Sequence, residues 1–596
     1  MTDLRRALDV AVAAAREAGD LLRTDFHRPG GPRGGGDKAE ADTEAEHLIR
    51  ARLTQAFPWR YLGEETGRAE GEAGAPVWVV DPNDGTRDYL VGRRGSAVSI
   101  GLVHEGQPLL GVVFAFAYPD GEGDLFAWAR GCGLVHRNGV PVVARLPEEL
   151  GPLDSVLVSS KGDRDPDTNL RCSAPARYRT LPSIAHRLAL LAAGEGAATS
   201  SLWAPHDWDY GAGHALLTGA GGALVDEDGR AVGYAEDGTS RCRRAFGGSR
   251  RVAEELARRP WEHASSAPWG DVRPTRVPPG RAVADVALLR RAQGCLLGQV
   301  AGDSLGSLVE FMAAADIRAA HGDGPLRLAD GGVHRTLAGQ PTDDSEMALA
   351  LARAVIEAGR FDPDAVRAAY VRWLESSPFD VGLTTRSALA GQLQAGSQAN
   401  GSLMRVSPLG VFAWSLAPER AAALARADSA LTHPHPVCGD AAAAFTVAVA
   451  HGLRHGDARG AWEAARSWAG AHAETAVADA LARAAHEAPV CDGAQQGWVL
   501  VTLQAAFHAL LHAPTLEEGV VATVRRGGDT DTNAAVAGAL LGAVHGRPAI
   551  PTQWREMVLS CRSHPLRAPH PRPMAFWPAD VLEVAECLLI AGAEAG

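Results

Sequence analysis

The chain has 596 residues, of which 46% are hydrophobic and 22% charged, so it has enough apolar material for more than one core. Its net charge of -13 argues against general nucleic-acid binding, which needs a basic face. Eight scattered cysteines without a CxxC pair argue against a zinc ribbon or a thioredoxin-type motif, and they favour a reduced, cytoplasmic protein.

The first half of the chain alternates between helical and extended patterns. Residues 4–23 have the spacing of an amphipathic helix interrupted by charge, which is not typical of a signal peptide. Further helices are expected at residues 43–56, 184–193 and 209–217, and strands at residues 77–80, 96–103, 109–118 and 155–160. We therefore predict an α/β layered domain over residues 1–259, with carboxylates at the ends of its strands.

The second half follows a proline-rich segment. Residues 260–281 contain five prolines and no periodicity, which is typical of an extended linker. Beyond them, Ala/Leu-rich segments repeat every 3.6 residues, which predicts helices at 283–300, 344–358, 364–375, 439–452, 497–512 and 531–544. The longest apolar stretch near the C-terminus, 534–544, is shorter than the roughly 20 residues that span a bilayer. We predict an all-α domain over residues 282–596 and no membrane partner.

A dense group of acids follows the strand expected at 77–80. The sequence DPNDGT places Asp81 and Asp84 next to Gly85 and Thr86. Carboxylates at this density repel one another unless a cation lies among them, and an all-oxygen set suits Mg²⁺. The backbone amides of a Gly-containing turn can also hold a phosphate. Asp42, Glu64 and Asp209 lie in neighbouring acidic motifs.

The order of these motifs resembles the inositol monophosphatase superfamily over almost the whole first half. The shared elements are Asp42, GEE, DPxDGT, a VSIGL strand, GVVFAFAYPDGEGDLFAWARGCG and WDxxAG. The resemblance implies a Mg²⁺-dependent phosphomonoesterase acting on a small-molecule phosphate, and it leaves a homodimer open. It implies that two or three Mg²⁺ ions are bound by Glu64, Asp81, the Asn83 carbonyl, Asp84 and Asp209. It also implies that Glu64 is catalytic and that Asp209 contacts substrate. By the same resemblance, Asp42 and Thr86 position the attacking water, and the backbone of Gly85 and Thr86 binds phosphate.

Three residues depart from that family's pattern. Asn83 replaces an aliphatic residue, and Asp88 replaces an asparagine. Leu202 stands where inositol phosphatases carry an acid that hydrogen-bonds inositol, so we expect a substrate other than myo-inositol phosphate. The alternative interpretation of all these acids as turn residues and helix caps suits an isolated Asp-Gly pair better than this ordered set of elements.

A second set of acids lies before two helices of the C-terminal half. PTDDS contributes Thr342, Asp343 and Asp344, and GGDTDTN contributes Asp529, Asp531 and Thr532. Six oxygen side chains at two helix starts predict a site for a pair of divalent ions.

This arrangement resembles the ADP-ribosylglycohydrolase family from about residue 284 onward. Supporting elements are ANGSLMRVSPLG, with Asn400, Gly401 and Arg405, and LTHPHP, with His433 and His435. The resemblance implies that two Mg²⁺ or Mn²⁺ ions, held by the six residues, bind the hydroxyls of the distal ribose in an ADP-ribosylated protein or ADP-ribose derivative. It assigns Glu310, Asp344 and Asp529 to catalysis and Asn400 and Gly401 to substrate binding. Cleavage then passes through an oxocarbenium-like state.

Other residues of the second half have structural interpretations. We expect the THPHP turn to shape a pocket rather than to bind metal. Asp303 is interpreted as a buried structural acid, and Trp554, Phe576 and Trp577 as core residues rather than an adenine platform.

The leading hypothesis is a bifunctional hydrolase with one active site in each half, because neither site lacks an acidic ligand. The alternative is that one half is catalytically silent and binds ADP-ribose or a phosphometabolite. A third hypothesis is that both sites handle one class of metabolite, such as phosphorylated ADP-ribose or a 3′-phosphonucleotide, so that tethering raises the local concentration of a shared intermediate.

Overall fold

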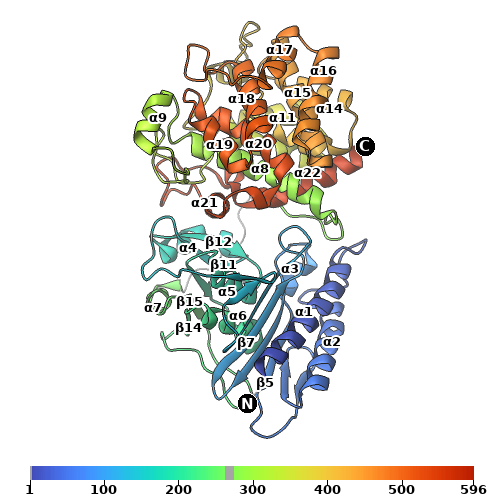
Figure 1. Ribbon diagram of the computed structural model, residues 1–596, viewed down its shortest axis with the longest axis vertical. Coiled ribbons are helices and arrows are strands. Elements are labelled where there is room, and N and C mark those ends of the chain that lie inside the picture. Colours follow the sequence, from blue (N-terminus) through green and yellow to red (C-terminus); the bar gives the residue numbers. More distant parts are fainter. Residues whose placement is uncertain (1–2, 262–273) are drawn as a thin grey trace. The chain divides into compact units, whose positions relative to one another are not determined.

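The computed structural model describes residues 3–261 and 274–596 and divides the chain into two compact units (Figure 1). The first unit comprises Met1–Gly270 and Val277–Ala284, and the second comprises Asp271–Arg276 and Asp285–Gly596. Most of the predicted linker, residues 262–273, lies outside the described residues.

The N-terminal unit contains two main β-sheets. The larger has eight strands in the order β10-β9-β8-β7-β6-β5-β3-β4, and the smaller has five in the order β12-β11-β13-β15-β14. The strands are β1 (Gly34–Gly35), β2 (Lys38–Ala39), β3 (Arg60–Gly63), β4 (Gly67–Ala69), β5 (Val77–Asp84), β6 (Ala97–His104), β7 (Gln107–Ala115), β8 (Asp124–Ala129), β9 (Val135–Arg137), β10 (Val140–Val142), β11 (Ser155–Ser159), β12 (Arg177–Leu181), β13 (Ala198–Ser201), β14 (Ala223–Val225) and β15 (Ala245–Gly248). The helices are α1 (Leu4–Phe26), α2 (Glu40–Ala56), α3 (Thr86–Leu90), α4 (Pro166–Ser173), α5 (Ile184–Ala192), α6 (Asp207–Gly219) and α7 (Arg250–Ala257).

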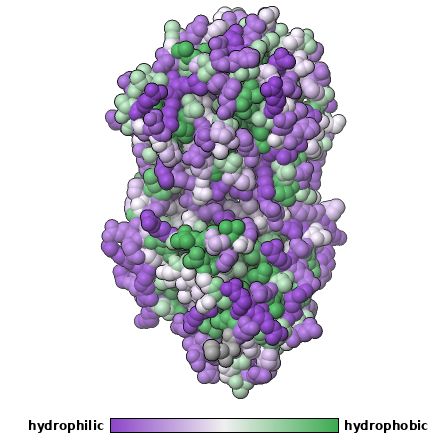
Figure 2. Space-filling model, in the orientation of Figure 1, coloured by the Kyte–Doolittle hydropathy of each residue, from purple (hydrophilic) through white to green (hydrophobic). Residues whose placement is uncertain are grey.

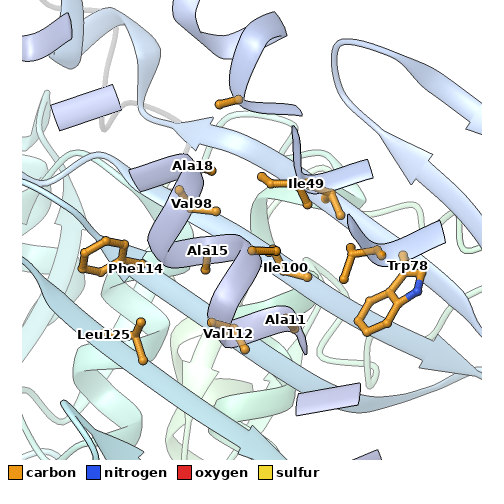
Figure 3. Close-up of a cluster of buried hydrophobic side chains, with 14 of the residues drawn as sticks. Ala11, Ala15, Ala18, Ile49, Trp78, Val98, Ile100, Val112, Phe114 and Leu125 are labelled. Atoms are coloured by element: carbon orange, nitrogen blue, oxygen red, sulfur yellow. The ribbon is translucent and has the colours of Figure 1, made fainter. Parts of the chain in front are cut away.

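Helices α1 and α2 cover one face of the large sheet. Small side chains of α1, such as Ala11 and Ala15, pack against Ile100 and Val112 of β6 and β7, as Figure 3 shows. Because alanine side chains are small, the helix backbone can pack closely against the strands. Burial of such apolar surface is the main favourable contribution to folding.

Helices α5 and α6 lie between the two sheets. Ala189 of α5 and Leu216 of α6 share a core cluster with Phe126 of the large sheet and Leu157 of the small one. Helices α4 and α7 cover the outer face of the small sheet, where Leu170 joins another cluster. The result is a five-layer arrangement of helices and sheets, which confirms the α/β layered prediction.

The described part of the C-terminal unit is helical, which confirms the all-α prediction. Its helices are α8 (Val286–Gly306), α9 (Ala314–His321), α10 (Asp343–Ala358), α11 (Pro363–Glu375), α12 (Leu383–Leu389), α13 (Ser407–Phe412), α14 (Pro418–Ala430), α15 (Pro436–His455), α16 (Ala458–His472), α17 (Thr475–Ala484), α18 (Val499–His512), α19 (Leu516–Val524), α20 (Thr530–His545), α21 (Thr552–Ser560) and α22 (Val581–Ala595). Trp554, Phe576 and Trp577 are buried, as expected of core residues.

A stripe of glycines joins α8 to α20 at the centre of this unit. In α8, glycines recur every four residues from Gly294 to Gly306 and face the backbone of α20. A Cβ on Gly298 would lie 2.4 Å from the carbonyl oxygen of Gly538. This contact brings the end of α8 against Asp531, so the sequence that packs the two helices also positions the second acidic cluster.

Hydrophilic side chains predominate on the visible face of the C-terminal unit (Figure 2). Within the described residues, helix α15 alone is long and apolar enough to cross a membrane, and 89% of its apolar window is buried inside the protein. This burial is what a core helix of a globular domain would show, and the helix is weak evidence for a membrane span.

Candidate active sites

The N-terminal site gathers acids from separate elements at the carboxyl end of β5. Asp81, Asp84 and Asp209 each place one carboxylate oxygen within 4.8 Å of the others. Asp81 and Asp84 end strand β5, and Asp209 lies in the first turn of α6, where it accepts a hydrogen bond from the His206 amide at 2.9 Å. Glu64 follows β3, the strand parallel to β5, so it reaches the same edge.

Asp84 is fixed by the start of another helix. Its Oδ2 accepts hydrogen bonds from the Ser183 hydroxyl at 2.6 Å and from the Ala185 amide at 2.7 Å. Ser183 caps α5, whose positive end favours an anion. The turn after Asp84 requires a left-handed backbone at Gly85, with φ of 102°. The glycine therefore allows the chain to turn directly into α3.

Asp42 and Thr86 form a separate pair beside these acids. The Thr86 hydroxyl lies 2.9 Å from Asp42 Oδ2 and 3.0 Å from the Asn83 carbonyl oxygen. The Asn83 amide donates to the other Asp42 oxygen, Oδ1, at 2.9 Å. Both oxygens of the buried Asp42 thus accept a hydrogen bond from the turn that follows β5.

The other two departures noted in the sequence also have visible consequences. Leu202 packs against the apolar cluster beside the small sheet and offers no polar atom to a ligand. Asp88 accepts a hydrogen bond from the Ser160 hydroxyl at 2.7 Å and lies 3.7 Å from Arg93.

The electrostatics of the N-terminal site call for a cation. Burial raises the pKa of Asp81 well above its ordinary value, and Glu64 and Asp84 raise it further. Burial and the Asp84 charge do the same for Asp209. Burial also raises the pKa of Asp42 to about 7. Since buried like charges are costly and the donors are all oxygens, these residues fit Mg²⁺.

The C-terminal site lines a cavity of about 510 Å³. It brings residues of the predicted motifs together with Asp380, which the sequence did not single out. The lining includes Glu310, Asp343, Asp344, Asp380, Asn400, Gly401, His433, Asp529, Asp531 and Thr532. Thr342 is buried next to it, and its hydroxyl oxygen lies 3.1 Å from Asp344 Oδ2 and 3.0 Å from Asp303 Oδ1.

Several polar groups hold these carboxylates in place. Asp303 accepts the backbone amides of Thr342 and Ser345, so it anchors the start of α10, as its structural interpretation predicts. Asn400 donates to Asp529 at 2.8 Å, and the Gly382 amide donates to Asp343 at 3.1 Å. Asn400 therefore positions a carboxylate rather than only facing the cavity.

The C-terminal residues also fit a divalent ion. Asp344 Oδ1 is buried without a hydrogen-bond partner. Burial raises the pKa of Asp344, with Asp303 and Asp529 adding to the shift, and it likewise raises that of Asp531, where Glu310 and Asp344 contribute. An acceptor atom buried without a donor, among carboxylates that repel one another, is what a cation would satisfy.

Sequence reasoning missed two residues of this site. Glu310, His334, Asp380 and Asp531 each offer one ligand atom within 4.8 Å of the others. Asp380 precedes α12 much as Asp343 begins α10, so an acid before a short helix was the available signal. His334 lies in a turn with no pattern that marks it.

The two histidines of the THPHP turn behave as expected of pocket-shaping residues. His433 is buried beside Gly401 and hydrogen-bonded to the Thr432 hydroxyl at 2.8 Å, and burial lowers its pKa to about 3. The Nδ1 atom of His435 accepts the Val437 amide at the start of α15.

Comparisons with known proteins agree with this division. Residues 3–265 match the inositol monophosphatase family, and residues 284–573 match ADP-ribosylglycohydrolase. An inositol-1-monophosphatase of Mesorhizobium japonicum is 34% identical over 37% of this chain and 86% of its own. The ADP-ribosyl-[dinitrogen reductase] glycohydrolase of Rhodospirillum rubrum is 30% identical over 44% of this chain and 88% of its own. The chain belongs to both families.

A further relative of the glycohydrolase half is less similar. The ADP-ribosylarginine hydrolase Tri1 of Pseudomonas putida is 28% identical over 50% of this chain and 81% of its own. Both halves therefore come from hydrolase families, and each contains a candidate metal site.

Proposed function

We propose that the chain is a bifunctional metal-dependent hydrolase, a phosphomonoesterase joined to an ADP-ribosyl hydrolase. The observation that carries this proposal is that each unit holds a converging carboxylate set with no acid missing from it. A catalytically inactive site is expected to lose such acids, because buried carboxylates destabilise the folded protein when no cation is bound to them.

In the phosphatase half, the protein's own residues position the water and the phosphate. Asp42 and Thr86, already hydrogen-bonded to each other, would hold the attacking water, with Asp42 accepting its proton. The Gly85 and Thr86 amides at the start of α3 would hold the phosphate oxygens. Mg²⁺ bound by Glu64, Asp81, the Asn83 carbonyl, Asp84 and Asp209 would lower the pKa of that water and neutralise the leaving oxygen.

The substrate of this half is proposed to be a sugar or nucleotide phosphate rather than myo-inositol phosphate. Leu202 is occupied with core packing, so the hydrogen bond expected to an inositol hydroxyl cannot form. A panel of inositol, sugar and 3′-nucleotide phosphates would test the point, and a preference for inositol phosphate would contradict it.

In the glycohydrolase half, the carboxylates would act on the anomeric carbon of a ribose. Mg²⁺ or Mn²⁺ held by the Asp343–Asp344 and Asp529–Thr532 segments would bind the ribose hydroxyls. Negative charge from nearby carboxylates such as Glu310 would stabilise the oxocarbenium-like state. The names of two relatives, which refer to ADP-ribosyl groups on dinitrogen reductase and on arginine, support an ADP-ribosylated protein as substrate.

The decisive experiment assays the full chain with Mg²⁺ and Mn²⁺ on both a phosphomonoester panel and an ADP-ribosylarginine protein. Metal-dependent turnover of both substrates is expected. Tight ADP-ribose binding by calorimetry without turnover would instead favour a binding module in the second half. Full activity in the presence of a strong chelator would overturn the proposal for both.

A further inference from the structure

An imidazole lies among the carboxylates of the glycohydrolase cavity. His334 offers a ring nitrogen to the same cluster as Glu310, Asp380 and Asp531, whose ligand atoms all lie within 4.8 Å of one another. Its Nε2 is hydrogen-bonded to Glu310 and lies 3.9 Å from Asp380. Ligands around one ion are separated by at most about 4.4 Å, because each lies about 2.0–2.2 Å from it. Shifts of a few tenths of an ångström would therefore close this group around a single dication.

The position of His334 is set by the turn that carries it. The Gly331 and Thr336 backbones pair with each other at 2.8 and 3.0 Å across this turn. The His334 carbonyl accepts a hydrogen bond from His570 Nε2 at 2.8 Å. The His334 ring lies 5.7 Å from that of Phe379, which stacks on His570 at 4.8 Å. Such support fixes the ring before any ion arrives, as in preorganised metal sites.

We propose that His334 is a nitrogen ligand for a divalent ion that it shares with Glu310, Asp380 and Asp531, and that it makes this site prefer a transition-metal ion to Mg²⁺. The inference rests on the proposed metal dependence of the glycohydrolase half. Mg²⁺ takes oxygen ligands and holds water tightly, whereas imidazole nitrogen suits the softer first-row transition ions. The described residues around Asp81, Asp84 and Asp209 form an all-oxygen cluster, so the preference should differ between the two units.

The competing explanation is that His334 only fixes Glu310 through their hydrogen bond. His334→Gln separates the two explanations, because the glutamine amide can still donate to Glu310 but brings no imidazole nitrogen. His512→Gln is the matched control, since His512 is an exposed histidine of the same unit that does not line the cavity.

The test uses the full chain carrying Asp84→Asn, which weakens the N-terminal metal site, loaded with Mn²⁺ alone. Pulsed electron paramagnetic resonance should show nitrogen modulation from one coordinated imidazole, which changes when ¹⁵N-histidine is incorporated. The modulation should vanish in His334→Gln and persist in His512→Gln. Calorimetry should show Mn²⁺ affinity falling about tenfold or more in His334→Gln, with Mg²⁺ affinity changing much less.

The outcomes separate this inference from the proposed function. Mn²⁺ that binds, is lost in Asp531→Asn, and shows no histidine nitrogen would overturn the role of His334 alone. Equal losses of Mn²⁺ and Mg²⁺ affinity in His334→Gln would also overturn it, because they indicate only a positioning contact. A glycohydrolase half that binds neither ion would overturn the proposed metal dependence as well.

Discussion

Both units hold mutually repelling carboxylates close together, but they do so with different secondary structure. In the N-terminal unit, the acids are held at the ends of parallel strands β3 and β5 and by the starts of α5 and α6. In the C-terminal unit, the acids lie at helix starts and loops around α8 and α20, which pack backbone to backbone. A sheet edge gathers side chains through strand register, whereas a helical bundle must do so through close helix contacts. The second site therefore depends on packing residues, such as Gly298 and Gly538, that do not line the cavity.

The independence of the two sites can be tested by removing one acid from each of them. Asp84→Asn should lower phosphatase activity by at least about a hundredfold and leave glycohydrolase activity unchanged, and Asp531→Asn should do the reverse. The reason is that a bound metal ion contributes several kcal/mol to stabilising the transition state. Steady-state assays of both activities on each full-length variant provide the measurement. A variant that silenced both activities would show that the sites are not independent.

Metal removal should make stability depend on pH in both units. Burial raises the pKa of Asp42 to about 7 and that of Asp303 to about 6, whereas unfolded aspartates titrate near about 4. The folded metal-free protein then binds more protons than the unfolded chain between about pH 4 and 7, so its stability falls as the pH rises through this window. Urea unfolding with a chelator at pH 5 and pH 8 measures this fall.

Added Mg²⁺ or Mn²⁺ should restore most of the stability at pH 8 and little at pH 5, because ions bind the deprotonated carboxylates. Stability that rose between pH 5 and pH 8 in the chelator would contradict the electrostatic account of both sites.

The helix contact can be tested without touching a metal ligand. Gly298→Ala places a Cβ 2.4 Å from the Gly538 carbonyl oxygen, so it should destabilise the C-terminal unit by about 1–3 kcal/mol. Gly470→Ala in α16 is the matched control, because a Cβ there meets nothing within 4 Å and should be neutral or slightly stabilising. Calorimetric unfolding of the full chain should show the loss in one transition. Equal losses of stability in the two variants would contradict the explanation that the glycines of α8 are needed for close packing against α20.

Much of the fold was predictable from the sequence, because apolar periodicity dictates which faces are buried. The runs at 77–80 and 109–118 are strands β5 and β7, and the pattern at 531–544 is helix α20, although most of the boundaries differ from the predicted ones. The close spacing of acids within one motif, such as Asp81 and Asp84, predicted that they belong to the same site. His334 could not be found this way, because only the fold of the turn at 331–336 brings it to Glu310.

The side-chain partner of Asp42 was likewise hidden in the sequence. The family resemblance assigns only the backbone carbonyl of Asn83 to the site, yet the side-chain amide of Asn83 donates to Asp42 at 2.9 Å. Thr86 alone would leave one Asp42 oxygen without that donor, and the carboxylate could then rotate away from the water position. The consequence is a small but specific difference between this N-terminal site and the aliphatic pattern of its family.

Asn83→Leu, which restores an aliphatic side chain, should therefore lower phosphatase kcat by about tenfold, since a hydrogen bond to a charged group contributes roughly 1.5 kcal/mol or more. KM should change little, because the phosphate is expected to bind the Gly85 and Thr86 amides, and glycohydrolase activity should be unaffected. The deprotonation that controls kcat should also shift to higher pH, because the Asn83 hydrogen bond lowers the pKa of Asp42. Full kcat with an unshifted pH profile would mean that Thr86 suffices to orient Asp42, and that Asn83 contributes only its backbone carbonyl to the site.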